Sequence, residues 1–215
     1  MPHLIETCRV RGGRLPLKPL HDARLSIGCR ALGIAYPGPL EVPEGMADGI
    51  VRFEVSAAGV VTSLRASAEP RVAGGHDPVG LVLSDVAHRP YPHKTTDRGQ
   101  FDDAMARARQ READDGLMLT LDGLVAECAI SSLFWWEGEE LCAPALDLGI
   151  LPGVARARIS QLVPLVERRV GPLVLLGRPL FVANAARGVV PVGSLDARDV
   201  GPDPRTGRLA KAFWG

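Results

Sequence analysis

Residues 87–97 (AHRPYPHKTTD) constrain the fold most, because this stretch cannot form a regular helix or strand. Pro90 and Pro92 stand two positions apart, and each removes a backbone donor and restricts the residue before it. Patterns of regular structure lie on both sides of the segment. We therefore expect a boundary here that separates a first domain, a linker and a second domain: residues 1–86, 87–93 and 94–215.

The first domain is predicted to combine several strands with one helix. Residues 3–11 are typical of a strand, and residues 19–33 predict a helix that begins at Pro19 and ends at Gly33. The other predicted elements are a loop at 34–48, a hairpin with strands at 50–56 and 60–67, and a strand at 79–86. The apolar residues that we expect on one face of the helix are Leu20, Ala23, Ile27 and Ala31.

The second domain is predicted to mix helices with short strands, so the whole chain is expected to be α/β or α+β. A helix over 98–112, with Thr96 or Asp97 as its N-cap, should be followed by two strand–turn–strand units around 121–123 and 137–138. A second helix is expected over 152–170, interrupted by Pro164. The remaining predictions are strands at 173–177, 180–184 and 189–197, then a loose tail from about 199 in which Phe213 and Trp214 are candidates for docking.

Composition indicates a folded, water-soluble chain without a strong electrostatic field. Hydrophobic residues make up 46% and charged residues 23% of the 215 positions, and the formal net charge is +0. We therefore expect no nucleic-acid or membrane partner. No apolar run approaches the ~20 residues that cross a bilayer, and the charged N-terminal residues do not resemble a signal peptide. A cytoplasmic protein with free thiols is expected, at Cys8, Cys29, Cys128 and Cys142.

Lys94 is the first candidate for chemistry. Only three of the 25 basic residues are lysines, namely Lys18, Lys94 and Lys211, so this chain generally uses arginine for surface charge. Lys94 also lies between a proline segment and a predicted helix, which together hold it stiffly. A lysine amine can lose its proton and form a Schiff base with a carbonyl, whereas arginine cannot. A solvated loop lysine is the common alternative.

Other residues offer functional and structural interpretations side by side. Glu127 stands in an apolar run, so it either faces outward on a strand or is buried and needs a cationic partner. The helix start in LPGVAR (151–156) and the turn NAARG (184–188) offer free N–H groups to a phosphate, or are an ordinary helix start and an ordinary turn. Arg24 lies off the apolar helix face, where a surface salt bridge is the alternative. His88 and His93 lack metal-ligand spacing, and we interpret both as non-ligands, with no metal site expected.

These pieces together resemble the fold-type-IV pyridoxal-phosphate enzymes, the class IV aminotransferase family. LIETCRV followed by LPLKPLHDARL is similar to the family's entry strand and to its helix with a His-x-x-Arg-Leu pattern. HKTTDR resembles the segment with the Schiff-base lysine, and is most similar to that of the 4-amino-4-deoxychorismate lyases. The run from LDGLVAECAI to LPGVARARI follows the family signature in order and spacing, and FVANAARGVVPV resembles its last cofactor-binding strand and turn.

The resemblance implies pyridoxal 5′-phosphate as the cofactor and a role for each candidate. Lys94 is implied to form the Schiff base and to move the proton at the substrate Cα. Glu127 is implied to pair with the pyridine nitrogen and keep it protonated, and Leu151 to pack on the ring face. The residues implied to hold the phosphate are Arg24, Gly153, Val154, Ala155 and Asn184.

The family also implies an architecture and an activity. We expect a small N-terminal α/β domain, a larger C-terminal pseudo-barrel domain, the cofactor between them, and a homodimer that acts on a small-molecule amino substrate. The first hypothesis is a lyase that converts 4-amino-4-deoxychorismate to 4-aminobenzoate and pyruvate for folate precursor synthesis, with Arg98 attracting a substrate carboxylate. The alternatives are a class IV aminotransferase for branched-chain or D-amino acids, and a homologue that binds without catalysis.

The sequence departs from the family at a few positions. Ser132 stands where the family usually has Asn, and Ala143 where it usually has Thr. We also expect the chain to lack the short leading strand and turn of many members, because it starts close to the entry strand. These differences are expected to affect substrate recognition more than cofactor binding.

Overall fold

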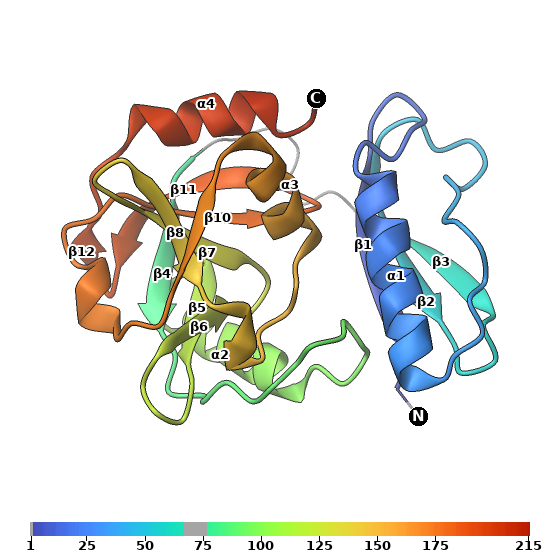
Figure 1. Cartoon of the computed structure of the whole chain (residues 1–215), viewed down its shortest axis with the longest axis horizontal. Helices are drawn as coiled ribbons and strands as arrows, with labels where there is room; N and C mark the ends of the chain where they lie inside the picture. Colours follow the sequence, from blue (N-terminus) through green and yellow to red (C-terminus); the bar gives the residue numbers. More distant parts are fainter. Residues whose placement is uncertain (1, 67–76) are drawn as a thin grey trace.

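The chain forms two lobes, each built around its own β-sheet (Figure 1). The computed structural model describes residues 2–66 and 77–215, so position 67 of the predicted strand 60–67 lies outside the described residues. The small lobe is a three-stranded antiparallel sheet in the order β1-β2-β3, with one helix packed against it. Its elements are β1 (Leu4–Val10), α1 (Lys18–Leu32), β2 (Gly49–Val55) and β3 (Val61–Ala66).

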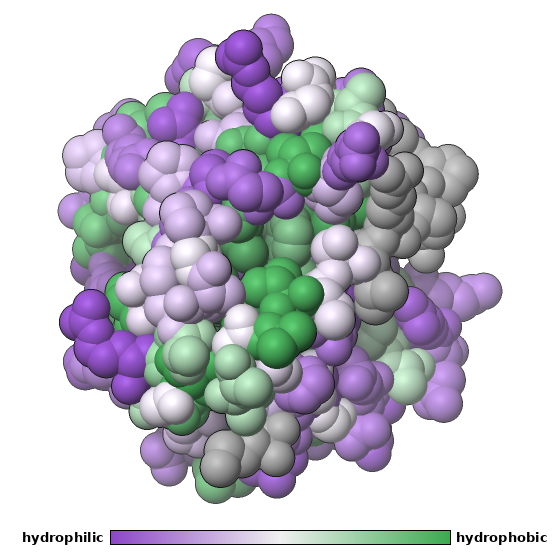
Figure 2. Space-filling model, turned by 90° about the vertical axis from the view of Figure 1, so that its right-hand side faces the viewer, coloured by the Kyte–Doolittle hydropathy of each residue, from purple (hydrophilic) through white to green (hydrophobic). Residues whose placement is uncertain are grey.

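The helix α1 forms as predicted, but it turns a different face to the core. Of the apolar residues expected to be inside, Ala23, Ile27 and Ala31 are exposed and Leu20 is only partly buried. The face that the small lobe turns to solvent accordingly mixes apolar with polar residues (Figure 2). The buried residues are His21, Leu25, Gly28 and Cys29.

Two observations explain the orientation of α1. A Cβ atom on Gly28 would lie 2.9 Å from the Leu4 side chain, so the glycine allows the helix to lie directly on β1. The same face brings His21 and Arg24 to the buried carboxylate of Glu6 on β1. A buried polar cluster therefore occupies the side of α1 that hydropathy alone assigns to solvent.

The large lobe curls a nine-stranded sheet into a half-barrel, in the order β6-β5-β4-β11-β10-β7-β8-β9 with β12 beside β11 (Figure 1). Its strands are β4 (Val79–Leu83), β5 (Asp115–Leu119), β6 (Val125–Cys128), β7 (Ser132–Glu137), β8 (Glu140–Pro144), β9 (Leu165–Arg168), β10 (Leu180–Asn184), β11 (Gly188–Leu195) and β12 (Arg198–Asp199). Its helices are α2 (Gly99–Gln110), α3 (Val154–Leu162) and α4 (Pro204–Ala212), with 3₁₀ turns η2 (Leu146–Leu148) and η3 (Pro172–Leu175).

The large sheet is apolar on both faces, and neighbouring residues of one strand serve different cores. In β7, Phe134 and Trp135 point to opposite sides, because side chains alternate along a strand. Trp135 joins the core inside the half-barrel, whereas Phe134 stacks on Phe181, with ring centres 4.9 Å apart, in the core beneath α3 and α4. Both cores extend to the rim of the sheet, where β6, α3 and the turn after β10 meet.

Three sequence predictions for the large lobe are wrong. The predicted helix 152–170 ends at Leu162, and after Pro164 the chain continues as β9, which pairs in parallel with β8. The predicted strand 173–177 is instead the 3₁₀ turn η3. The tail predicted to be loose forms α4, whose N-cap Asp203 accepts a hydrogen bond from the Arg205 N–H.

The strand β4 decides where the two lobes divide. It was expected in the first domain, yet it lies between β11 and β5 and pairs in parallel with both. The expected linker 87–93 therefore follows a strand that already belongs to the large sheet. We propose instead that the division falls between β3 and β4, and that 87–97 is a segment of the large lobe that reaches the small one.

The general fold class is as the sequence predicted, an α/β chain with a small N-terminal lobe and a larger curled sheet. The strand–turn–strand units around 121–123 and 137–138 are confirmed as the antiparallel pairs β5–β6 and β7–β8. The cysteines are free and buried. Within the described ranges, no helix has the length and apolar character needed to cross a membrane.

The docked C-terminus gives a first testable prediction. Phe213 follows α4 and is fully buried in the core that contains Phe134 and Phe181. Phe213→Ala is expected to lower the free energy of unfolding by about 3–5 kcal/mol, because it leaves a cavity there. Urea unfolding measures the change, with Lys211→Ala on the exposed side of α4 as the control. Equal stability of the two variants would show that the tail is loose after all.

Candidate active site

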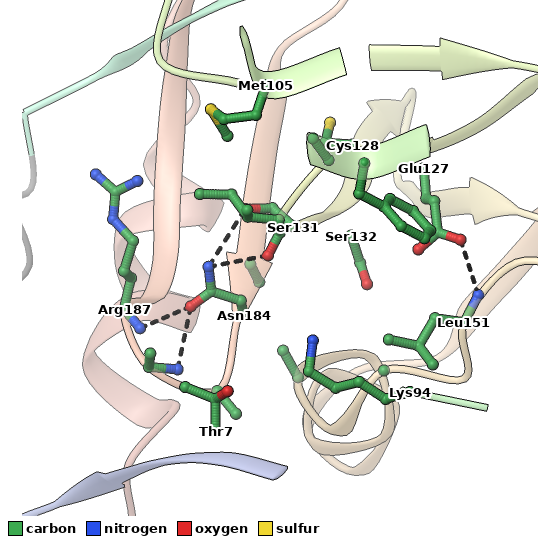
Figure 3. Close-up of a pocket in the computed structure, with 18 of the residues that line it drawn as sticks. Thr7, Lys94, Met105, Glu127, Cys128, Ser131, Ser132, Leu151, Asn184 and Arg187 are labelled. Carbon is green, nitrogen blue, oxygen red and sulfur yellow. Dashed lines mark hydrogen bonds between the residues drawn. The ribbon is translucent and has the colours of Figure 1, made fainter. Parts of the chain in front are cut away.

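A large cavity of about 740 Å³ opens between the two lobes (Figure 3). That volume is in the range of cavities that hold a cofactor or a small-molecule ligand. β1 and α1 form one wall, and the other comes from the segment before α2, the end of β6, the start of α3 and the turn after β10. All of the residues that the sequence singled out for the cofactor line it: Arg24, Lys94, Glu127, Leu151, Gly153, Val154, Ala155 and Asn184.

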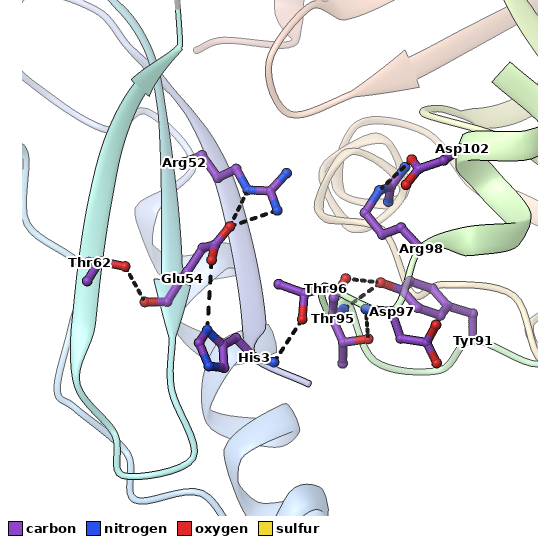
Figure 4. A network of polar contacts seen from close by, with 10 residues as sticks. All are labelled: His3, Arg52, Glu54, Thr62, Tyr91, Thr95, Thr96, Asp97, Arg98 and Asp102. Carbon is purple, nitrogen blue, oxygen red and sulfur yellow. Dashed lines mark hydrogen bonds and ion pairs between the residues drawn. The ribbon is translucent and has the colours of Figure 1, made fainter. Parts of the chain in front are cut away.

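The segment that carries Lys94 is fastened to the small lobe by backbone hydrogen bonds. The Ile5 N–H donates to the Lys94 carbonyl at 2.8 Å, and the Thr96 N–H donates to the His3 carbonyl at 2.9 Å. The His3 N–H in turn donates to the Thr96 hydroxyl at 3.0 Å (Figure 4). Lys94 therefore occupies a short, strand-like edge beside β1.

Side chains hold the rest of this irregular segment. The Tyr91 hydroxyl accepts a hydrogen bond from the Thr95 N–H and donates one to the Thr95 carbonyl, both at 2.5 Å (Figure 4). The Gln100 amide similarly accepts from the Arg89 N–H and donates to the Arg89 carbonyl. These contacts satisfy backbone groups that the prolines prevent from entering regular structure.

The Lys94 amine points into the cavity, toward the space between Ser132 and Asn184 (Figure 3). Burial, followed by the nearby charges of Arg98 and Arg24, lowers the pKa of Lys94 to about 7 against the opposing effect of the acidic residues. The amine is thus substantially unprotonated near neutral pH. An unprotonated amine is the form that attacks a carbonyl carbon.

Glu127 is the buried carboxylate of the cavity, with 6% of the residue exposed. Its Oε1 accepts hydrogen bonds from the Leu151 N–H at 3.0 Å and from His88 Nε2 at 2.9 Å. Among the described residues no arginine or lysine forms an ion pair with it. His88 was predicted only as a non-ligand of metals, because its spacing in the sequence gives no sign of the contact with Glu127.

The start of α3 presents backbone donors to the cavity. Gly153 is the N-cap, no side chain caps the helix, and Val154 and Ala155 of the first turn line the cavity wall. A Cβ atom on Gly153 would lie 2.9 Å from the Ser132 hydroxyl, so only glycine lets the helix end approach β7 this closely. The positive end of a helix with free N–H groups is suited to a phosphate.

Asn184 is fully engaged within its own turn. Its Oδ1 accepts from the N–H groups of Ala186 and Arg187, and its Nδ2 donates to the Ile130 carbonyl and the Ser131 hydroxyl. Both amide hydrogens are therefore in use. The side chain ties the turn after β10 to the turn after β6, and we propose that it shapes the phosphate region rather than donating to a phosphate itself.

Arg24 lines the cavity while its guanidinium is held from behind by Glu6. Nε and Nη2 of Arg24 donate to the two oxygens of Glu6 at 2.8 and 2.6 Å, and His21 Nδ1 lies 2.5 Å from the same carboxylate. Burial alone would raise the pKa of Glu6, but Arg24 and His21 outweigh it and bring that pKa down to about 2. Cys8 lies beside Glu6 and His21, but the arginine already occupies the carboxylate in this cluster.

The cavity also contains the cations Arg187 and Arg98. Within the described part of the chain, Arg187 Nε is buried and has no hydrogen-bond partner, whereas Arg98 Nε lies 3.7 Å from the Asp102 carboxylate. Arg98 donates through Nη2 to the Ala129 carbonyl at 3.0 Å, and its guanidinium lies 5.1 Å from the centre of the Phe101 ring. A cavity with such groups favours a ligand that carries negative charge.

Of the two positions at which the sequence departs from the family, Ser132 lines the cavity. Ala143 is buried in the core beneath α3 and is not part of the cavity lining.

Comparison with known proteins agrees with the resemblance seen in the sequence. A family model described as amino-transferase class IV matches residues 3–195. A probable branched-chain-amino-acid aminotransferase of Thermotoga maritima is 32% identical over 124 residues, which cover 54% of this chain and 45% of that relative. An aminodeoxychorismate lyase of Bacillus subtilis is 52% identical over 47 residues, or 22% of this chain and 16% of that relative. The matches thus span less than half the length of these two relatives.

Solved structures share the fold over nearly the whole chain. A 4-amino-4-deoxychorismate lyase of Pseudomonas aeruginosa superposes with a TM-score of 0.80 at 24% identity, covering 98% of this chain and 89% of that one. A hypothetical aminotransferase of Mycobacterium tuberculosis, solved with alpha-ketoglutarate and PMP bound, gives a TM-score of 0.82 at 19% identity and covers 98% and 87%. The predicted two-lobed fold is confirmed by these similarities.

The lowered pKa of Lys94 gives a prediction for the cofactor-free protein. Its pKa of about 7 lies below the ordinary 10.5, so the fold disfavours the charged amine. The resulting loss in the free energy of unfolding is complete below about pH 7 and disappears as the pH rises toward 10.5. Lys94→Met is therefore expected to raise the free energy of unfolding by about 1–3 kcal/mol near pH 6, after allowance for partial exposure, and by much less near pH 10.

Urea unfolding at both pH values measures this difference. Lys211→Met, at an exposed lysine of α4, is the matched control and should show no such pH dependence. A Lys94→Met variant that is equally stable to wild type at both pH values would contradict the lowered pKa.

Proposed function

Because the chain belongs to the class IV aminotransferase family, whose cofactor is pyridoxal 5′-phosphate, we propose that it is the lyase that converts 4-amino-4-deoxychorismate to 4-aminobenzoate and pyruvate. The reaction breaks one C–H bond and one C–O bond and makes the ring aromatic. It needs an amine that reacts with carbonyls, a base for one proton, and a site for a substrate with carboxylates. The cavity between the lobes offers candidates for each.

The residues of the cavity fit this cofactor. When bound, pyridoxal phosphate supplies an aldehyde that reacts with amines and a protonated ring that withdraws electrons from the carbon attached to the amine. Lys94 is the amine that would tether it, and Glu127, a buried carboxylate without an arginine or lysine in an ion pair among the described residues, would face the ring nitrogen. Leu151 would pack on the ring, and the phosphate would lie between the N–H groups at Gly153–Ala155 and the part of Arg24 that Glu6 leaves free.

Lys94 would also serve as the base. With the cofactor bound, the amine of Lys94, whose pKa is about 7 in the chain alone, would remove the proton from the carbon that carries the substrate amine. Loss of that proton would allow the C–O bond to the three-carbon side chain to break. The side chain would leave as enolpyruvate and become pyruvate by taking up one proton at its methylene carbon. The atoms of the substrate are thereby divided between the two products without any oxidant or reductant.

The observation that supports the choice of substrate is the pair of arginines Arg98 and Arg187 in the cavity lining. 4-Amino-4-deoxychorismate has two carboxylates, so both a cation near Lys94 and a second cation farther away are needed. Arg98, four residues after Lys94 and in an ion pair with the exposed Asp102, would be the first, and Arg187, whose Nε has no hydrogen-bond partner among the described residues, would be the second. A branched aliphatic side chain would leave the Arg187 guanidinium unpaired.

The alternative is a class IV aminotransferase for branched-chain or D-amino acids. The similarity to the Thermotoga maritima relative favours it, as do apolar residues of the same cavity, namely Phe101, Met105 and Ile130. Both reactions use the same lysine and the same proton. They differ in whether that proton is returned to the cofactor or a substituent is expelled.

The product of the reaction tests the proposal directly. Protein loaded with pyridoxal phosphate is expected to release 4-aminobenzoate and pyruvate in equal amounts from 4-amino-4-deoxychorismate. Lys94→Ala should abolish the release, because it removes both the tether and the base. Conversion of the cofactor to its amino form by branched-chain or D-amino acids, without pyruvate release from the chorismate derivative, would favour the aminotransferase instead.

Arg187 provides a prediction about substrate recognition. Arg187→Met is expected to raise KM for 4-amino-4-deoxychorismate about tenfold to a hundredfold, because one charged hydrogen bond to a carboxylate is lost. Arg187→Lys should retain part of the affinity. The matched control is Arg107→Met, since Arg107 pairs with the exposed Asp85 away from the cavity. An unchanged KM in Arg187→Met would show that Arg187 does not bind a carboxylate of the substrate.

A further inference from the structure

We propose that His88 is a positioning residue for Glu127: its imidazole turns one carboxylate oxygen away so that the other faces the cofactor's ring nitrogen. The inference rests on the proposed function only in that the cavity binds pyridoxal phosphate. It holds for the lyase and for the aminotransferase alike.

One oxygen of Glu127, Oε1, accepts both hydrogen bonds that this carboxylate receives from the described residues. His88 Nε2 lies 2.9 Å from Oε1, and the Leu151 N–H donates to the same atom at 3.0 Å. Within the described part of the chain, Oε2 takes no hydrogen bond, and Glu127 lines the cavity. Two donors on one oxygen fix the rotation of the carboxylate and leave the second oxygen for a donor that comes from the cavity.

His88 is itself held in place by its backbone and by the packing of its ring. The backbone N–H of His88 donates to the Leu119 carbonyl at 2.7 Å. The residue also forms an isolated parallel β-bridge with Thr120, just after β5. Only 3% of the residue is exposed, and its ring meets the Phe101 ring edge-on, with centres 6.4 Å apart. The imidazole therefore has little freedom to follow Glu127 if that carboxylate moves.

The protonation state of His88 decides whether a full positive charge lies beside Glu127. His88 Nδ1 is buried and has no hydrogen-bond partner in the described ranges 2–66 and 77–215. A hydrogen on Nδ1 would be an unpaired buried donor, and a bare Nε2 would face the carboxylate oxygen without a hydrogen between them. The geometry thus favours a neutral imidazole with its hydrogen on Nε2.

A neutral donor orients a carboxylate without neutralising it. The other buried carboxylate of this cavity region shows the contrast, because both oxygens of Glu6 are taken by Arg24. Glu6 is satisfied within the chain, whereas Glu127 keeps a negative charge that a protonated ring nitrogen can pair with. His88 is suited to this task because it supplies one hydrogen bond and no full charge.

The experiment measures the protonation of the ring nitrogen. Cofactor-free protein is loaded with pyridoxal phosphate labelled with ¹⁵N in the ring, and the ¹⁵N chemical shift is recorded for wild type, His88→Phe, His88→Gln and Lys211→Gln. We expect the protonated shift in wild type and a displacement toward the unprotonated shift in His88→Phe. Cofactor affinity should fall about tenfold to a hundredfold in His88→Phe, as for the loss of a hydrogen bond to a charged group.

The other variants separate positioning from packing. His88→Gln keeps an N–H that can reach Glu127 and should restore part of the wild-type shift. Lys211→Gln alters an exposed side chain of α4 that does not line the cavity, and should leave the shift and the affinity unchanged. A folded His88→Phe protein with the wild-type shift and affinity would overturn the inference.

A measurement on wild type alone covers the case in which the Phe variant does not fold. Long-range ¹⁵N–¹H correlation spectra report which ring nitrogen of His88 carries hydrogen, and we expect Nε2 alone. Hydrogen on Nδ1 with a bare Nε2 would overturn the inference, since no donor would then face Glu127. Failure of the proposed function gives a different result, a protein that binds pyridoxal phosphate with the expected ¹⁵N shifts but releases no 4-aminobenzoate or pyruvate from 4-amino-4-deoxychorismate.

Discussion

The hydrogen bonds between β1 and the Lys94 segment are the contact on which the site depends. Through Ile5, His3 and Thr96 they make an irregular, proline-containing stretch an edge partner of the small sheet. The same contact places Lys94 between the lobes. Burial of the amine is the leading cause of its lowered pKa. The contact between the lobes and the lowered pKa of the lysine therefore depend on the same segment.

The charged groups on both walls of the cavity are held in place by hydrogen bonds within the chain. Glu6 and His21 immobilise Arg24 on the small-lobe wall, so that a guanidinium next to β1 is rigid before any ligand arrives. On the opposite wall, Glu127 accepts hydrogen bonds from the Leu151 N–H and, as we propose, from a neutral His88. Groups that are held in place in this way would orient a ligand with a cationic ring at one end and an anionic group at the other, at little further entropic cost.

The sequence predicted what depends on local pattern and missed what depends on distant partners. The hairpins, α2 and the start of α3 follow from turn residues, prolines and alternation. The inner face of α1 did not follow, because Glu6 on another element makes His21 and Arg24 a buried pair. β9 was missed for the same reason, since the four residues after Pro164 are a strand only beside β8. His88 meets Glu127 across 39 positions, which no spacing rule connects.

The turn after β10 links cofactor geometry to substrate choice. Asn184 fixes the N–H groups of Ala186 and Arg187, and Arg9 Nε on β1 donates to the Ala186 carbonyl at 2.8 Å, so the turn is held from both lobes. Because the backbone of Arg187 is fixed in this way, its side chain enters the cavity from a constant point. Changing residue 187 should then alter which acid is bound while leaving Lys94 and Glu127 in place. We propose that residues at the rim of the large sheet carry out the chemistry and that this turn, held from both lobes, determines the selectivity.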